Sequence, residues 1–71
     1  MYAIIDQLKN GDQFENHFNT AEEALRHAEC EWARMSDYDK NRREYYWVVC
    51  ADLDDDDCID MNTATIVKEF K

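Results

Sequence analysis

The sequence lacks most of what common functional motifs require. Its 71 residues include one glycine and no proline, so it has no glycine-rich loop of the kind that cradles phosphates. No apolar run approaches the roughly 20 residues that a membrane-spanning helix needs, and no segment has the pattern of a secretory signal. We therefore expect a single soluble domain, residues 1–71, located in the cytoplasm and without a membrane partner.

Cysteine and histidine are few and scattered. The three cysteines, Cys30, Cys50 and Cys58, are an odd set at irregular spacing, whereas small secreted domains usually carry a dense, even set. Neither they nor His17 and His27 form the closely spaced pairs typical of structural zinc sites. No nucleophile motif surrounds any Cys or Ser. We expect no metal ligands among these Cys and His residues, no cofactor and no enzymatic activity.

Positive charge is also scarce. Eight Lys and Arg residues against 17 Asp and Glu residues give a formal net charge of −9. Because proteins contact phosphates mainly through Lys and Arg, direct binding to nucleic acid or to an anionic membrane is disfavoured. A net charge of this size also keeps a small protein soluble, so it does not by itself indicate a binding partner. If the protein has a protein partner, we expect that partner to be basic.

What the sequence does have is a dense acidic segment, DLDDDDCID, at residues 52–60. Its six carboxylates, the candidate binding residues, are Asp52, Asp54, Asp55, Asp56, Asp57 and Asp60. The spacing matches part of a calcium-binding loop, but Asp57 stands where glycine is needed and Thr63 where a bidentate glutamate is needed. Three interpretations stay open: a solvated turn, a weak divalent-cation (calcium) site, and a surface that attracts a basic protein.

Alternating apolar residues on both sides of Asn10-Gly11 predict a β-hairpin. A two-residue turn would divide the apolar residues between the two faces. A three-residue loop with a bulge at Gly11 places all of them on one face, namely Tyr2, Ile4, Leu8, Phe14 and Phe18. We therefore favour the bulged hairpin.

A helix is predicted near residues 20–36. Thr20 followed by Glu23 is a capping-box pattern, and the acidic first turn suits the helix dipole. Apolar residues then recur at helical spacing and define the expected buried stripe: Ala21, Leu25, Ala28, Trp32 and Met35. The polar segment SDYDKNRR, residues 36–43, is interpreted as a connection.

The segment EYYWVVCADL, residues 44–53, predicts a central strand, because both of its alternating sets are apolar. The last segment, residues 62–71, fits a strand or a short helix, and its β-branched residues favour the strand. Together these elements predict an α+β fold with the element order β-β-α-β-β. Its antiparallel sheet has three or four strands in the order 2-1-3-4, with one helix packed on one face.

One helix covers only one face of such a sheet. Because the third strand is apolar on both faces, we expect Ile5, Tyr46 and Val48 to line an open apolar face. If the other alternating set of residues 44–53 lies on the open face, Tyr45 takes the place of Tyr46 there. Patches of this kind mark protein interfaces, including homodimer interfaces. The sequence therefore predicts a non-enzymatic protein-binding module. Its partner is either a basic protein or a second copy of this chain. In the first case the module would imitate the charge of nucleic acid and so block a basic groove of that protein.

The segment FNTAEEALRHAECEWARMSDYDK, residues 18–40, leads into an apolar strand and carries a wider pattern. A hairpin precedes F-x-T-x-E-E-A, a tryptophan lies within the helix, and a Met-Ser ending precedes a charged loop. This pattern resembles a group of short uncharacterised bacterial proteins associated with phage-like and mobile elements. The matching residues are Phe18, Thr20, Glu22, Glu23, Ala24, Trp32, Met35 and Ser36. The resemblance implies the hairpin-helix fold and no particular activity.

Overall fold

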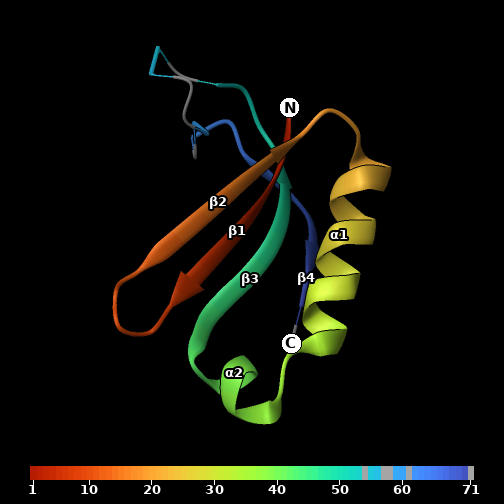
Figure 1. Cartoon of the computed structure of the whole chain (residues 1–71). Coiled ribbons are helices and arrows are strands. Elements are labelled where there is room, and N and C mark those ends of the chain that lie inside the picture. The colour runs from red at the N-terminus through yellow and green to blue at the C-terminus, as the bar shows by residue number, and fades with distance from the viewer. Residues whose placement is uncertain (54, 57–58, 61, 71) are drawn as a thin grey trace.

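The computed structural model describes residues 1–53, 55–56, 59–60 and 62–70 (Figure 1). Along this described chain the elements are β1 Tyr2–Leu8, β2 Gln13–Phe18, α1 Ala21–Arg34, α2 Asp37–Asn41, β3 Arg43–Cys50 and β4 Thr65–Glu69. The strands pair antiparallel in one sheet with the order β2-β1-β3-β4. The predicted α+β fold, the strand order and the C-terminal strand are confirmed.

The hairpin between β1 and β2 has the predicted bulged loop. Tyr2 pairs with Phe18, which is the register of a three-residue loop. The backbone N–H of Leu8 donates to the carbonyl oxygen of Asp12 over 2.8 Å. Gly11 has a φ of 102°, a conformation that glycine adopts without the steric penalty of a side chain. The register of the hairpin is therefore fixed by a single glycine together with the apolar pattern.

Helix α1 begins at the predicted cap and lies over one face of the sheet (Figure 1). The side chain of Thr20 accepts a hydrogen bond from the backbone N–H of Glu23 over 3.2 Å. The fully buried residues of α1 are Ala24 and Ala28, whose small side chains let the helix approach the strands closely. Ala24 is not part of the predicted apolar stripe, so the side of α1 that is most deeply buried is rotated slightly from the predicted one.

We call the sheet side that α1 covers the helix face. Its core consists of Ile4, Ala24, Ala28, Tyr46 and Val48, bordered by Tyr2, Phe18, Leu25, Trp32, Met35 and Phe70. The ring of Trp32 lies 5.5 Å from that of Tyr46 and 5.7 Å from that of Phe70. Phe14 belongs to the same face but is 56% exposed, because the hairpin end diverges from the helix (Figure 1).

The predicted connection after α1 contains the short helix α2. The hydroxyl of Ser36 caps it by accepting from the backbone N–H of Asp39 over 3.2 Å. Arg43 follows and donates to the carboxylate of Asp6 over 3.0 Å and to the carbonyl oxygen of Asp39 over 2.7 Å. A helix of five residues is too short to show a hydrophobic period, so sequence patterning did not reveal it.

Candidate binding surfaces

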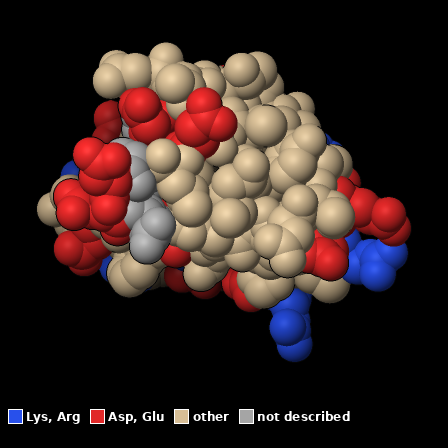
Figure 2. Space-filling model, turned by 90° about the horizontal axis from the view of Figure 1, so that it is seen from above, with Lys and Arg blue, Asp and Glu red and all other residues tan. Residues whose placement is uncertain are grey.

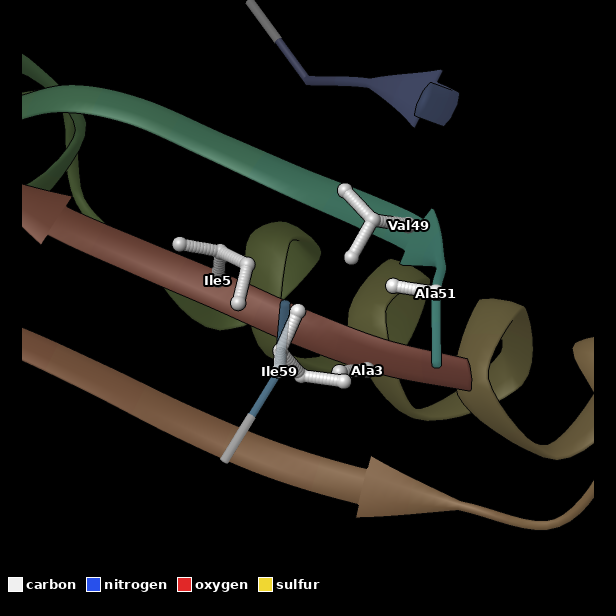
Figure 3. Packing of buried hydrophobic residues seen from close by; sticks show 5 residues of the cluster. All are labelled: Ala3, Ile5, Val49, Ala51 and Ile59. Atoms are coloured by element: carbon white, nitrogen blue, oxygen red, sulfur yellow. The ribbon is translucent and has the colours of Figure 1, made fainter. Parts of the chain in front are cut away.

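On the sheet side opposite α1, which we call the loop face, two apolar residues of the acidic segment, Leu53 and Ile59, pack against the core. Ile59 is 7% exposed. It packs against four residues from the two central strands and the residue after them, namely Ala3, Ile5, Val49 and Ala51 (Figure 3). Leu53 forms an antiparallel β-bridge with Ile59 and packs against the same cluster. The apolar residues within the acidic segment therefore fasten it to the core.

The predicted open apolar face is wrong. Ile5, Tyr46 and Val48 are 0%, 3% and 0% exposed. Ile5 pairs with Trp47 across β1 and β3, so Ile5 belongs to the loop face, whereas Tyr46 and Val48 belong to the helix face. Because both alternating sets of β3 are apolar, the hydrophobic pattern did not show which set faces the helix and which shares a face with Ile5. The reversed parity, with Tyr45 on the face away from the helix, is the one observed.

Hydrogen bonds close the base of the acidic loop, which we define as residues 52–60. The backbone N–H of Asp60 donates to the carbonyl oxygen of Asp52 over 2.9 Å. The hydroxyl of Thr63 accepts from the N–H of Asp52 over 3.2 Å and donates to the carbonyl oxygen of Asp60 over 3.0 Å. Thr63, which the sequence suggested only as a mismatch to a calcium loop, thus holds the loop closed.

The predicted binding carboxylates of the loop differ in what surrounds them. Asp52, Asp55 and Asp56 are exposed. The carboxylate of Asp60 instead accepts a hydrogen bond from the backbone N–H of Asn62 over 2.9 Å, so it serves the turn that follows the loop. The remaining two predicted residues, Asp54 and Asp57, lie outside the described residues.

Glu15 of β2 adds a carboxylate beside the loop, which sequence reasoning missed. Its side chain accepts from the backbone N–H of Ile59 over 3.4 Å and lies 2.6 Å from Nε2 of His17. Glu15 is 44 positions from Ile59 in the chain, so only the fold brings them together. In the view of Figure 2, Asp and Glu side chains form a cluster at one side of the molecule, and most of the visible Lys and Arg atoms lie toward the opposite side, next to further acidic side chains.

The described residues do not form a metal centre. Among them, no three His, Cys, Asp or Glu side chains are grouped so as to hold a metal ion. The carboxylate of Asp60 is already engaged in the turn, and the glycine that a calcium loop requires is replaced by Asp57. Since part of the loop lies outside the described residues, the divalent-cation interpretation stays a prediction.

Tyr46 shows how strongly the helix face is shielded from water. Burial raises its pKa to about 12, and the negative charges of Glu31 and Asp6 act in the same direction. Both causes disfavour the phenolate, so the hydroxyl stays neutral at physiological pH. This shift is that of a packed core residue, and it does not prepare the hydroxyl to act as a nucleophile or base.

A groove lies between the end of β2 and the flank of α1. It has a volume of about 520 Å³ and is lined by Phe18, Glu23, Arg26, His27, Cys30, Glu31 and Arg34. The ring of His27 lies 5.3 Å from that of Phe18, and its Nε2 lies 3.6 Å from the carboxylate of Glu31. The groove depends on the angle between strand and helix, which the sequence pattern does not specify.

The chain matches no family model, no curated protein and no solved structure. The resemblance to small bacterial proteins of mobile elements therefore stays a prediction. Neither helix in the described part of the chain has the length and apolar character that crossing a membrane requires.

Proposed function

We propose that the protein is a non-enzymatic binding module whose acidic loop takes a basic surface of a partner protein. One observation carries this proposal: Leu53 and Ile59 fasten the loop to the core, while Asp52, Asp55 and Asp56 are exposed. A folded loop loses less conformational entropy on binding than a free tail of equal charge. This arrangement supports recognition at a fixed place on the surface.

The charge around the loop favours a basic partner. No Lys or Arg occurs between Arg43 and Lys68, so this stretch supplies no cation of its own to neutralise the carboxylates. Clustered charge of one sign speeds association with a surface of the opposite sign. A nucleic-acid-binding groove is the kind of basic surface that such a loop would occupy, with carboxylates in the place of phosphates.

Self-association is the weaker alternative. Each copy carries a formal charge of −9, so two acidic loops would repel one another. The apolar face that motivated a homodimer is also buried, since Ile5, Tyr46 and Val48 lie in the two cores.

The proposal is tested by binding of a fluorescent lysine homopeptide, measured by anisotropy at low and at near-physiological salt. Neutralising the loop with Asp52→Asn, Asp55→Asn and Asp56→Asn is expected to weaken the affinity about tenfold at low salt, because each exposed charge contributes on the order of 0.5 kcal/mol. The difference should shrink as salt rises.

A matched control removes the same amount of charge elsewhere, through Glu22→Gln, Glu29→Gln and Glu44→Gln. If the control variant loses as much affinity as the loop variant, net charge alone attracts the peptide and the proposed site is wrong. Affinity capture with mass spectrometry then uses the same pair of variants. A true partner is retained by the wild type and the control but is lost from the loop variant.

A further inference from the structure

The two edges of the sheet, β2 and β4, differ in how well they are protected. β4 has five residues, includes Lys68, and pairs with β3 across a register shift. β2 has six residues without Lys, Arg or Pro, and it pairs with β1 in an unbroken register. Charged lysines, short length and bulges are the features that keep edges from accepting another strand. β2 is thus the edge that is open to strand addition.

The hydrogen-bond pattern shows which groups of β2 point outward. The backbone N–H of Ala51 donates to the carbonyl oxygen of Met1 over 3.0 Å, so the odd-numbered residues of β1 bond to β3 and the even-numbered ones bond to β2. On β2 the N–H and C=O groups of Gln13, Glu15 and His17 therefore point to the outer edge. In the described chain, no strand pairs with that edge.

A strand added to β2 would meet a different surface on each side. On the helix face it would run beside the groove, which is lined by Phe18, His27 and Cys30 together with four charged residues of α1. The ring of Phe18, at the end of β2, is the contact that favours apolar side chains on that side. On the loop face it would run beside Glu15, which contacts the backbone of Ile59 in the acidic loop. Side chains on that side would meet carboxylates, so basic residues suit it.

We propose that β2 is a docking edge for an extended segment of the partner in which basic and apolar residues alternate. This inference rests on the proposed function and names the segment that the partner presents. Backbone hydrogen bonds to β2 supply affinity, and the alternating side chains supply specificity. A second copy pairing through β2 fits less well, because it would bring two acidic loops to one edge.

The test uses a short peptide that alternates lysine and valine, titrated into the full chain and followed by NMR amide exchange. Binding is expected to slow exchange of the Gln13, Glu15 and His17 amides, which point outward in the free protein. A peptide of the same sequence with N-methyl groups on alternate residues should bind at least about tenfold more weakly, because it loses the backbone donors. The lysine homopeptide serves as the purely electrostatic reference.

Two variants, each with a matched control, locate the edge and the groove. His17→Pro removes an outward N–H, a change that an edge strand tolerates, and it should weaken the alternating peptide about tenfold more than His17→Ala does. Cys30→Trp fills the groove and should weaken the same peptide, whereas Ala33→Trp, on an exposed part of α1 outside the groove, should not. Circular dichroism confirms that each variant is folded.

The outcomes separate the two proposals. If the lysine homopeptide and the N-methylated peptide bind as tightly as the alternating peptide, and the β2 amides stay unprotected, strand addition is wrong. The acidic-loop proposal then stands if the loop variant binds the homopeptide more weakly than the charge-matched control does, and falls if the two bind it equally. If the alternating peptide protects the β2 amides but neutral loop variants bind it equally well, the docking edge stands without the loop. If no peptide binds, both proposals are overturned.

Discussion

The two faces of the sheet are closed by different means. On the helix face, α1 packs small residues, Ala24 and Ala28, against Ile4 and Val48. On the loop face, the cover within the acidic loop comes from Leu53 and Ile59. The helix presents a continuous apolar stripe, whereas the loop places isolated apolar anchors among carboxylates.

This difference affects both stability and function. A helix holds its cover through many cooperative backbone hydrogen bonds, while the loop is held by a β-bridge and a few hydrogen bonds at its base. Segments with few buried contacts open at lower free energy than the rest of a fold. We therefore expect the helix face to carry more of the stability, and the loop face to respond more readily to a partner.

The largest effect is expected at the helix face, from Trp32→Ala. The ring contacts those of Tyr46 and Phe70, so its loss should lower the free energy of unfolding by about 3 kcal/mol. Urea denaturation measures the change. Tyr38→Ala, at an aromatic residue that is 71% exposed, is the control and should cost less than about 0.5 kcal/mol. Equal losses would show that Trp32 is not part of the core.

The pH dependence of stability sharpens the same comparison. The pKa of Tyr46 is about 12 in the folded protein, against an ordinary value of 10.0. Its contribution is fully present below pH 10 and is lost as the pH rises to 12, because the unfolded chain ionises first. The loss should reach roughly 2–3 kcal/mol near pH 12. Denaturation from pH 9 to 12 should show it in the wild type and not in Tyr46→Phe; parallel curves would contradict it.

The loop face is tested with Ile59→Ala. Ile59 is 7% exposed, and the loss should be about 2 kcal/mol, at the low end for a buried aliphatic residue, since the loop is able to open locally. Ile66→Ala is the control, because that side chain is 43% exposed. Denaturation and amide exchange of β1 measure the effect. If both variants behave alike, the loop does not seal this face.

The smallest effect is expected from Asp55→Asn in the loop. Asp55 is exposed, and removing one charge from a crowded acidic segment should raise stability by at most about 0.5 kcal/mol, and only at low salt. Thermal denaturation at two salt concentrations measures it. A clear loss of stability would mean that the carboxylates, and not the apolar anchors, hold the loop in place.

The elements that the sequence predicted correctly are those with a local signal. The hairpin register follows from Gly11, and the start of α1 from Thr20. The parity of β3 against β1 could not be predicted, because both alternating sets of β3 are apolar and either register buries one of them. The error at Ile5 and Tyr46 follows from that ambiguity.

The candidate site was less predictable than the fold. Four of the six predicted binding carboxylates fall among the described residues. Asp52, Asp55 and Asp56 are exposed, whereas the side chain of Asp60 serves a turn, which the sequence did not predict. Ile59 gave no signal, because an isolated apolar residue among acids has no period from which burial can be read. Glu15 joins the loop only through long-range pairing. An exposed carboxylate on an edge strand would have been the only hint.

The open edge of β2 also has a consequence for colloidal behaviour. In the described part of the chain no strand pairs with the outer edge of β2, and repulsion between chains of net charge −9 opposes its pairing with another copy. That barrier disappears near the isoelectric point of about 4.4. We expect acidification to this pH to produce edge-to-edge β association while the core is still folded, so that the acidic composition protects the protein from its own sheet.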